Sequence, residues 1–224
     1  MSDDLTTFRI EKRGAVDWLT LDRPESRNAI NLRMATELRD YFGGLSEDES
    51  VRIVVMRGAG PSFCAGLDIK AAGELSGPDA PFGAGMGFQS YLAEVYIRMR
   101  RCPQPIISLV QGAACGGGFS FVLASDIRVA GESARFGVTE VQRGLFPLAG
   151  STVRLRRQIP YAIAAEILLT GEDFTAARAF DLGLVNHVVP DGQALPKARE
   201  IAQRIVENGP LAVIAILATL RETE

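Results

Sequence analysis

Three consecutive glycines constrain this chain more than any other feature, because they stand where a strand would turn into a helix. They occupy positions 116–118, between apolar residues 105–110, which predict a buried strand, and residues 119–124, which predict a buried helix. Such a turn leaves backbone N–H groups unshielded at the positive end of the helix dipole, where they can stabilise a developing negative charge. A tight turn or close packing would also explain the glycines, so both interpretations stay open at this point.

The pattern of glycines and charges argues against two classes of ligand. The glycine run matches neither G-x-G-x-x-G nor G-x-x-x-x-G-K-[ST], the patterns typical of nucleotide binding. With 24 basic and 27 acidic residues, the chain has a formal net charge of −3, which disfavours binding of nucleic acid through a basic surface. The arginine-rich residues 154–157 predict one solvated helix face. We therefore expect no nucleic-acid partner.

The cysteines and the apolar runs bear on the compartment. Cys64, Cys102 and Cys115 show neither metal-ligand spacing nor a disulfide framework, so we expect a reduced, cytoplasmic protein without a metal site. Residues 1–4 lack the apolar core of a signal peptide. The longest apolar run, residues 211–220, is too short to span a bilayer, and we expect no membrane partner.

Strands and helices alternate along the chain, which predicts an α/β fold with right-handed crossovers. Alternating apolar residues around Gly14 predict a hairpin over residues 8–21, and Asn31 is placed to cap the next helix. Residues 73–87, rich in glycine, proline and alanine, predict an active-site lid or a long surface loop. Further strands are expected at residues 52–56, 127–130 and 184–189, and further helices at 159–169, 174–182 and 193–207.

The last predicted helix begins at Pro210 and has almost no polar face. A helix that is apolar all round has to be buried, yet the sequence stops at Glu224 with nothing after it to provide cover. We expect either that neighbouring subunits bury this helix or that the natural chain is longer.

Two further segments could complete an anion site. Residues 62–70 form a loop of small residues after the strand at 52–56, so one N–H group from each loop could point at a shared oxygen. Glu140 stands among apolar and glycine residues at 135–147, and such surroundings would raise the pKa of its carboxyl group, as suits a general base near neutral pH. The alternative for Glu140 is a surface or capping glutamate.

Several motifs follow one another along nearly the whole chain. They are Arg23-Pro24…Arg27-Asn28-Ala29, Phe63-Cys64-Ala65-Gly66-Leu67-Asp68, Gly112-Ala113-Ala114-Cys115-Gly116-Gly117-Gly118, Ala124-Ser125-Asp126, Phe136-Gly137…Glu140…Gly144 and Leu169-Thr170-Gly171-Glu172…Ala176…Ala179…Gly183-Leu184-Val185. In order and spacing the chain resembles the enoyl-CoA hydratase/isomerase (crotonase) family. Because several independent motifs agree, the resemblance is specific.

The resemblance implies a crotonase-like α/β spiral of ββα repeats with a C-terminal helical region. Residues 1–190 would form the core, and residues 191–224 would begin the helical trimerisation region, which would be incomplete here. It further implies acyl-CoA thioesters as substrates, with coenzyme A as part of the substrate and no separate cofactor. Homotrimers, or hexamers built as dimers of trimers, are the expected assembly.

The resemblance also assigns residues to the site. The two oxyanion N–H groups would belong to Leu67 and Gly117, and they would stabilise the thioester oxygen as it becomes an enolate oxygen. The backbone of Ala65 and Ile69 would lie beside the adenine end of coenzyme A, and Arg27 near its phosphates. Asp68 and Ser120 complete the predicted substrate-binding set.

One departure from the family pattern bears on the reaction. Hydratases of the family carry two catalytic glutamates; the second corresponds to Glu140, but the position of the first holds Ser120. A serine cannot act as a carboxylate base, whereas moving a double bond needs only one base, which removes a proton at C2 and returns it at C4. The resemblance therefore favours 3,2-enoyl-CoA isomerisation. The alternatives are enoyl-CoA hydration, decarboxylation or thioester hydrolysis at the same oxyanion site, and acyl-CoA binding without catalysis.

A serine hydrolase has less support. The chain has no G-x-S-x-G elbow, and its single histidine, His187, falls in a predicted structural strand. Asp68 and Asp126 are interpreted as turn and cap residues, and Cys115 as a small packed residue.

Overall fold

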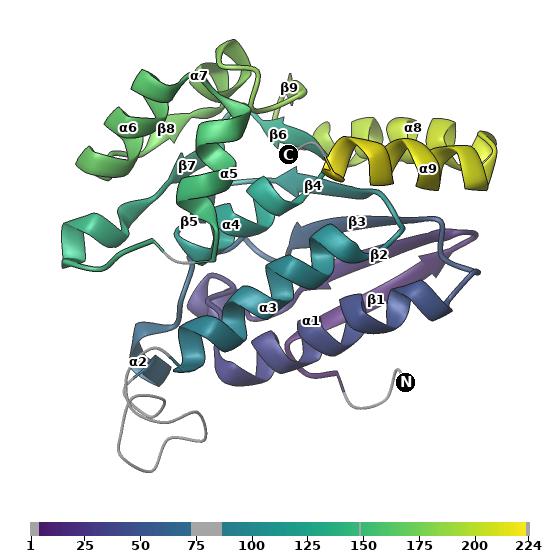
Figure 1. Cartoon of the computed structure of the whole chain (residues 1–224), viewed down its shortest axis with the longest axis horizontal. Coiled ribbons are helices and arrows are strands. Elements are labelled where there is room, and N and C mark those ends of the chain that lie inside the picture. Colours follow the sequence, from purple (N-terminus) through teal and green to yellow (C-terminus); the bar gives the residue numbers. More distant parts are fainter. Residues whose placement is uncertain (1–4, 73–86, 148, 223–224) are drawn as a thin grey trace.

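The computed structural model describes residues 5–72, 87–147 and 149–222, in which a six-stranded sheet lies beside a three-stranded one (Figure 1). The main sheet has the order β1-β2-β3-β4-β6-β9, and all its pairs are parallel except β1 with β2. Its strands are β1 (Phe8–Arg13), β2 (Val16–Leu21), β3 (Ile53–Gly58), β4 (Ile106–Val110), β6 (Ile127–Gly131) and β9 (His187–Val189). The smaller sheet comprises β5 (Ala113–Cys115), β7 (Arg135–Gly137) and β8 (Phe174–Thr175).

Helices separate most of these strands. The α-helices are α1 (Leu32–Gly44), α2 (Ile69–Ala72), α3 (Gly87–Arg101), α4 (Gly117–Ala124), α5 (Ser151–Gln158), α6 (Tyr161–Thr170), α7 (Ala176–Asp181), α8 (Ala194–Glu207) and α9 (Pro210–Glu222). Short 3-10 turns occur at η1 (Pro24–Ser26), η2 (Leu45–Glu47) and η3 (Thr139–Arg143).

The predicted spiral of ββα repeats is confirmed. In each turn a strand of the main sheet is followed by a short extended segment beside the main sheet, and then by a helix. Thus β4 leads to β5 and α4, while β3 leads to Cys64, which bridges Ala114 of β5, and then to α2 and α3. Successive turns of the spiral run parallel to one another. The short segments that follow the main strands therefore lie next to each other, as β5 does beside Cys64 and β7.

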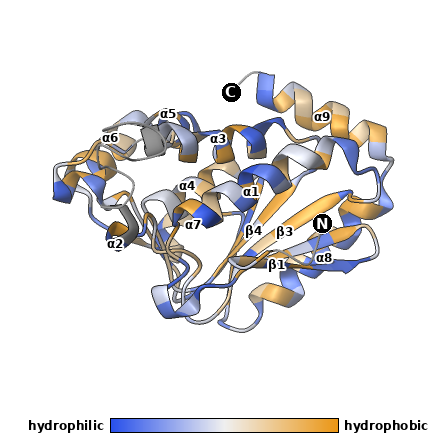
Figure 2. Ribbon diagram, turned by 90° about the horizontal axis from the view of Figure 1, so that it is seen from below, coloured by the Kyte–Doolittle hydropathy of each residue, from blue (hydrophilic) through white to orange (hydrophobic). Residues whose placement is uncertain are grey.

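Two hydrophobic clusters lie on opposite faces of the main sheet. Successive side chains of a strand point to opposite faces, so Leu19 packs with α1, α3 and α4 on one face while Trp18 packs with α8 on the other. Central strands covered on both faces need apolar residues throughout, as β3 and β4 show (Figure 2). The first helix of the expected C-terminal region, α8, therefore contributes to the core.

Local signals in the sequence place several elements correctly. The hairpin turns at Gly14, whose φ is +62°, and the side chain of Asn31 caps α1 by accepting a hydrogen bond from the N–H of Met34 at 2.9 Å. The strands expected at 52–56 and 127–130 correspond to β3 and β6, and the helices at 159–169 and 193–207 to α6 and α8, each within two residues.

Other expectations need correction. The segment 174–182 is not one helix: Phe174 and Thr175 form β8, and Thr175 caps α7 by accepting a hydrogen bond from the N–H of Arg178 at 3.1 Å. The strand expected at 184–189 is shorter, because the N–H groups of Leu184 and Val185 both donate to the carbonyl of Ala179. Neither α3 nor the strands β5 and β7 were expected. The predicted lid at 73–87 lies, apart from Gly87, outside the described residues.

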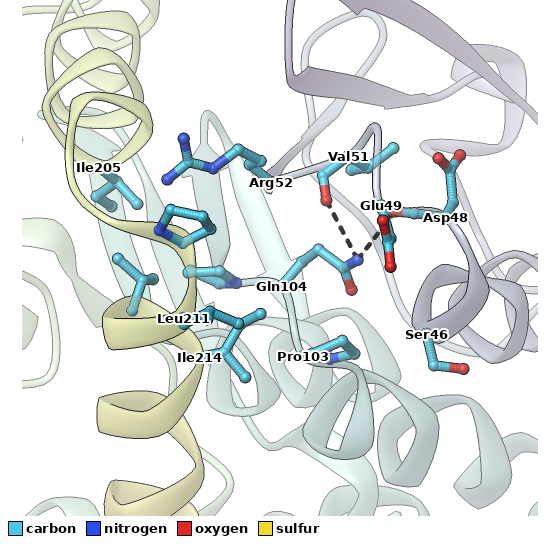
Figure 3. A pocket seen from close by; sticks show the side chains of 13 residues that line it. Ser46, Asp48, Glu49, Val51, Arg52, Pro103, Gln104, Ile205, Leu211 and Ile214 are labelled. Atoms are coloured by element: carbon cyan, nitrogen blue, oxygen red, sulfur yellow. Dashed lines mark hydrogen bonds between the residues drawn. The ribbon is translucent and has the colours of Figure 1, made fainter.

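Helix α9 is largely exposed, so the described chain does not cover its apolar side chains, as the sequence indicated. Only Leu217 is buried, whereas Leu211 is 80% exposed and Leu220 64%. Its last turn is fixed by Arg221, which forms an ion pair with Asp126 at 2.8 Å. A hollow of about 390 Å³ between α9, α8 and residues 46–52 contains none of the predicted site residues (Figure 3). Among the described residues no single helix is long and apolar enough to cross a membrane; α8 and α9 pass only as a pair, which is bent by 110°.

Candidate active site

The glycine turn lies where β5 runs into α4. Gly116 has φ +51° and ψ −122°, a backbone conformation that side chains essentially forbid. Its N–H donates to the carbonyl of Gly137 at 2.9 Å, which ties the turn to β7. Gly118 passes so close to the carbonyl of Cys64 that a Cβ there would collide with it. The glycines are therefore required by the backbone path, and they leave the start of α4 without side chains.

The loop that carries Leu67 lies directly against this turn. Cys64 bridges Ala114, with the N–H of Cys115 donating to the carbonyl of Cys64 at 3.0 Å, and a Cβ on Gly66 would stand 3.3 Å from the nitrogen of Gly117. Two loops that are 50 residues apart in the sequence (67 against 117) thus share one surface.

Two N–H groups on this surface have no acceptor. Leu67 bridges Ile30 through hydrogen bonds made by its neighbours, at 2.7 Å from Ile30 N to Gly66 O and 3.0 Å from Asp68 N to Ile30 O. Strand geometry turns the N–H of Leu67 itself to the other side. Within residues 5–72, 87–147 and 149–222, the N–H groups of Leu67 and Gly117 both lack a hydrogen-bond acceptor. Donors without an acceptor on two adjoining loops are a prerequisite of an oxyanion hole.

Buried polar side chains hold the Leu67 loop in place through hydrogen bonds and an ion pair. The buried amide of Asn28 donates to the carbonyls of Ala59 and Ser62, both at 2.9 Å. Asp68, predicted to contact substrate, forms an ion pair with Arg23 at 3.1 Å, with both side chains more than four-fifths buried. Asp68 therefore fixes the loop in this structure. The sequence motif contained Asn28 but gave no hint of its role.

Glu140 lies beside the glycine turn, as predicted. It lies in the first turn of η3, and a Cβ on Gly116 would stand 3.2 Å from its Oε1. Its Oε2 is buried and has no hydrogen-bond partner within the described part of the chain. Burial raises the pKa of the carboxyl group, opposed by a backbone hydrogen bond and by the nearby charge of Arg143. A buried carboxylate oxygen without a partner in the described chain does not fit the alternative of a solvent-exposed surface glutamate.

Ser120 is held by a partner that the sequence did not reveal. Its hydroxyl lies 2.6 Å from the hydroxyl of Ser151, the first residue of α5, and both side chains are buried. A weaker contact joins Ser120 Oγ to the carbonyl of Gly116 at 3.4 Å. Ser120 was predicted to contact substrate; the structure commits its hydroxyl to Ser151. The only available signal was a small polar residue after Gly150 at the start of a helix.

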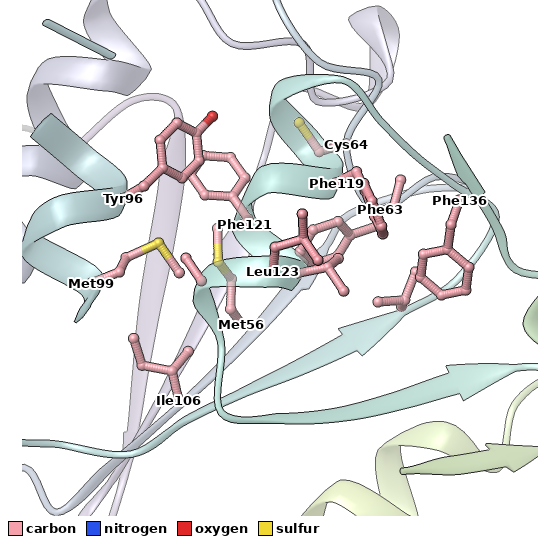
Figure 4. Packing of buried hydrophobic residues seen from close by; sticks show 14 of the residues in the cluster. Met56, Phe63, Cys64, Tyr96, Met99, Ile106, Phe119, Phe121, Leu123 and Phe136 are labelled. Atoms are coloured by element: carbon pink, nitrogen blue, oxygen red, sulfur yellow. The ribbon is translucent and has the colours of Figure 1, made fainter. Parts of the chain in front are cut away.

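Tyr96 of α3 is a second residue that sequence reasoning missed. It is completely buried, and its hydroxyl donates to the carbonyl of Gly117 at 2.9 Å. Its ring packs against Phe121 of α4, with ring centroids 4.9 Å apart (Figure 4). A tyrosine in an amphipathic helix is normally a packing residue, so no local pattern indicated this contact.

The residues assigned to coenzyme A, which are Arg27, Ala65 and Ile69, lie together on the exposed side of the Leu67 loop and are called the rim below. Arg27 and Ala65 are exposed and joined by a hydrogen bond from Ala65 N to Arg27 O at 3.0 Å. Ile69, at the start of α2, is 63% exposed. These three residues therefore form an open edge that continues from the Leu67 loop.

Side chains considered for other chemistry lie elsewhere or are inert. His187 lies on β9, where it pairs with Val129, and Asp126 accepts a hydrogen bond from Ile106 N at 2.8 Å besides pairing with Arg221. Burial raises the pKa of the Cys115 thiol, so a thiolate is disfavoured. Among the described residues, no three His, Cys, Asp or Glu side chains lie together as metal ligands would.

Comparison with known proteins gives consistent matches over almost the whole chain. A family model described as "Enoyl-CoA hydratase/isomerase" matches residues 11–223. The chain is 46% identical over 215 residues to "Enoyl-CoA hydratase EchA19" of Mycobacterium tuberculosis, covering 96% of this chain and 80% of that protein. It is 38% identical over 218 residues to "Carnitinyl-CoA dehydratase" of Proteus mirabilis, covering 97% and 81%.

Solved structures agree. The crystal structure of enoyl-CoA hydratase from Bacillus anthracis matches with a TM-score of 0.90 and 33% identity, covering 96% of this chain and 82% of that one. An enoyl-CoA hydratase from Mycobacterium tuberculosis matches with a TM-score of 0.84 and 36% identity, covering 97% and 82%.

Proposed function

This chain belongs to the enoyl-CoA hydratase/isomerase family, and we propose that it converts an acyl-CoA thioester through an enolate intermediate. One observation carries the proposal: among the described residues, Oε2 of Glu140 has no hydrogen-bond partner and lies beside the turn at which the N–H groups of Leu67 and Gly117 have no acceptor. A base and an anion-stabilising pair on one surface are the two components that enolate formation needs.

The proposed steps follow from this arrangement. The thioester oxygen accepts hydrogen bonds from Leu67 N–H and Gly117 N–H. Glu140 removes a proton from C2, and the electron pair of the broken C–H bond moves into the thioester, where the two donors stabilise the charge on oxygen. Glu140, now protonated, returns the proton at C4, and the double bond ends between C2 and C3. No atom is gained or lost in this sequence.

The serine pair favours isomerisation over hydration. Addition of water needs a group that activates water and a group that protonates carbon, and a second carboxylate would supply one of these. Ser120 stands at that position, with its hydroxyl bound to Ser151 at 2.6 Å. Proton transfer therefore depends on Glu140 alone, which is sufficient for moving a double bond.

Hydration is the second candidate, and the relatives favour it. Their names describe an enoyl-CoA hydratase and a carnitinyl-CoA dehydratase, reactions that add or remove water. A hydroxyl pair in place of the carboxylate could still hold a water molecule for Glu140 to deprotonate.

The rim and helix α9 support the remaining parts of the proposal. Exposed Arg27 supplies a cation for the phosphates of coenzyme A, which enters as part of the substrate and not as a separate cofactor. Association into a homotrimer, or a dimer of trimers, would cover exposed apolar side chains of α9 such as Leu211 and Ile216.

A paired assay tests the proposal. The purified protein is incubated in H₂¹⁸O with a 3-enoyl-CoA and, separately, with trans-2-enoyl-CoA; the products are separated by liquid chromatography against isomer standards and their masses are measured by mass spectrometry. We expect the 3-enoyl-CoA to be converted to a 2-enoyl-CoA of unchanged mass. We expect trans-2-enoyl-CoA to take up little ¹⁸O from the water. Rapid formation of ¹⁸O-labelled 3-hydroxyacyl-CoA from trans-2-enoyl-CoA, without isomerisation of the 3-enoyl-CoA, would establish hydration instead.

A further inference from the structure

We propose that Tyr96 is a positioning residue of the oxyanion site, whose hydroxyl holds Gly117 in the orientation that points its N–H at the thioester oxygen. The inference rests on the proposed function, because it assigns a role to a contact of the Gly117 turn. It concerns a side chain that lies beneath the site and does not touch the reacting atoms.

The contacts of Tyr96 converge on Gly117. The tyrosine hydroxyl donates to the carbonyl of Gly117 at 2.9 Å, and a Cβ added to Gly117 would stand 3.0 Å from that same hydroxyl and 3.0 Å from Cδ1 of Ile30. Tyr96 and Ile30 therefore both contact Gly117 and leave no room for a side chain there. Packing of the Tyr96 ring on Phe121 fixes the hydroxyl relative to α4 (Figure 4).

The turn needs such a contact because its own residues do not determine its conformation. Three glycines in succession have a wide choice of φ and ψ. Backbone hydrogen bonds fix Gly116, through Gly137, and Cys115, through Cys64. Gly117 is the first residue of α4 and is tied to the helix through its carbonyl; within the described residues, Tyr96 is the side chain that donates to the same carbonyl. Donors in an oxyanion hole are effective only when they are held in place before the charge develops.

The hydroxyl is also a permanent donor. Burial raises the pKa of Tyr96 well above its ordinary value of 10, with smaller contributions from Cys64 and Glu140. Tyr96 therefore stays protonated throughout the range in which Glu140 ionises, and its loss should lower the rate by a constant factor at every pH.

The test compares Tyr96→Phe with Tyr41→Phe. Tyr41 is a matched control: its hydroxyl donates to buried Asp17 at 2.9 Å, away from the site. Each variant loses one hydroxyl and one hydrogen bond. Because a bond to a charged group is worth more than one to a carbonyl, Tyr41→Phe should lower the melting temperature at least as much as Tyr96→Phe.

We expect only one of the two variants to lose catalytic rate. Tyr96→Phe should lower kcat about tenfold with little change in KM, because removing a donor outright costs about 10²–10³ and misplacing one costs less. Tyr41→Phe should keep the wild-type kcat. Infrared spectra of bound octanoyl-CoA, labelled with ¹³C at the thioester carbonyl, provide a direct readout. The carbonyl band should shift to lower frequency in wild type and Tyr41→Phe, and by clearly less in Tyr96→Phe.

The outcomes separate the two proposals. A Tyr96→Phe variant with wild-type kcat and a full carbonyl shift would overturn the role of Tyr96 and leave the proposed function intact. If bound octanoyl-CoA shows no carbonyl shift in the wild type itself, the oxyanion assignment fails, and the role of Tyr96 fails with it.

Discussion

The carboxyl group of Glu140 lies against Gly116, so closely that a Cβ on Gly116 would stand 3.2 Å from Oε1. The residues come from different turns of the spiral, and the hydrogen bond from Gly116 N–H to Gly137 O holds the two segments together. The base and the start of α4 are therefore parts of one rigid surface. Changes at Gly116 should affect both stability and catalysis.

Gly116→Ala should be destabilising and nearly inactive. With φ +51° and ψ −122°, a side chain at this position would cost about 1–3 kcal/mol of backbone strain, and relief of that strain would move the turn or push Glu140 aside. Urea unfolding and kcat measure the two effects. Gly14→Ala is the control, because Gly14 also has positive φ but no atom near its missing Cβ. Equal activity in the two variants would contradict the proposed coupling.

The rate should depend on pH through Glu140. A general base works only when ionised, and burial raises the pKa of this carboxyl above the ordinary 4.5. We therefore expect kcat/KM to fall as the pH is lowered through a midpoint above 4.5, and the acid limb to be absent from the residual activity of Glu140→Gln. A wild-type midpoint at or below 4.5 would contradict a buried base.

Glu140 should also lower the stability of the fold at neutral pH. Because its folded pKa is raised, the folded state binds the proton more tightly than the unfolded state does. The stability that results is fully present below the unfolded pKa and is lost as the pH rises through the folded pKa. The glutamine of Glu140→Gln does not ionise. As the pH rises from 4.5 to neutrality, the free energy of unfolding of this variant should therefore increase relative to that of the wild type. Urea denaturation at several pH values measures the difference; a gap that is constant with pH is the contrary result.

A second carboxylate should convert the reaction only if Ser151 makes room for it. Ser120 and Ser151 are both buried and 2.6 Å apart, so Ser120→Glu alone should destabilise the protein and fail to hydrate trans-2-enoyl-CoA. Combined with Ser151→Gly, it should fold better and gain hydratase activity. Ser151→Gly alone serves as the control and should turn over 3-enoyl-CoA as the wild type does, without gaining hydratase activity. Failure of a well-folded double variant to add water would contradict the account of the serine pair.

Local features of the sequence predicted much of the fold. The hairpin around Gly14, the cap at Asn31 and the glycine turn before α4 each depend on a few neighbouring residues, and all three are present. The short strand β5 was missed because three residues give no periodic signal; it exists through its pairing with β7. The composition of helix α9 indicated that it needs cover from outside residues 1–224, and its side chains are largely exposed; the residues of one helix do not specify which surface covers it.

In the candidate site too, residues that stand out in their local sequence were predicted, and residues that act through distant partners were missed. The glycine run and Glu140 stood out in the sequence because their types are unusual in their surroundings. Tyr96 and Ser151 did not, because each acts on a residue that is distant in the sequence, 21 positions away for Tyr96 and Gly117 and 31 for Ser120 and Ser151. Only the folded arrangement reveals such pairs.

The central claim is that Glu140 alone moves the proton, and turnover of Glu140→Gln tests it most directly. The variant keeps the size of the side chain and removes the base. We expect kcat on 3-enoyl-CoA to fall by about 10²–10⁴, the usual contribution of a positioned general base, while octanoyl-CoA still binds with nearly wild-type affinity. A variant that binds octanoyl-CoA and retains most of the wild-type kcat would show that another group carries the proton.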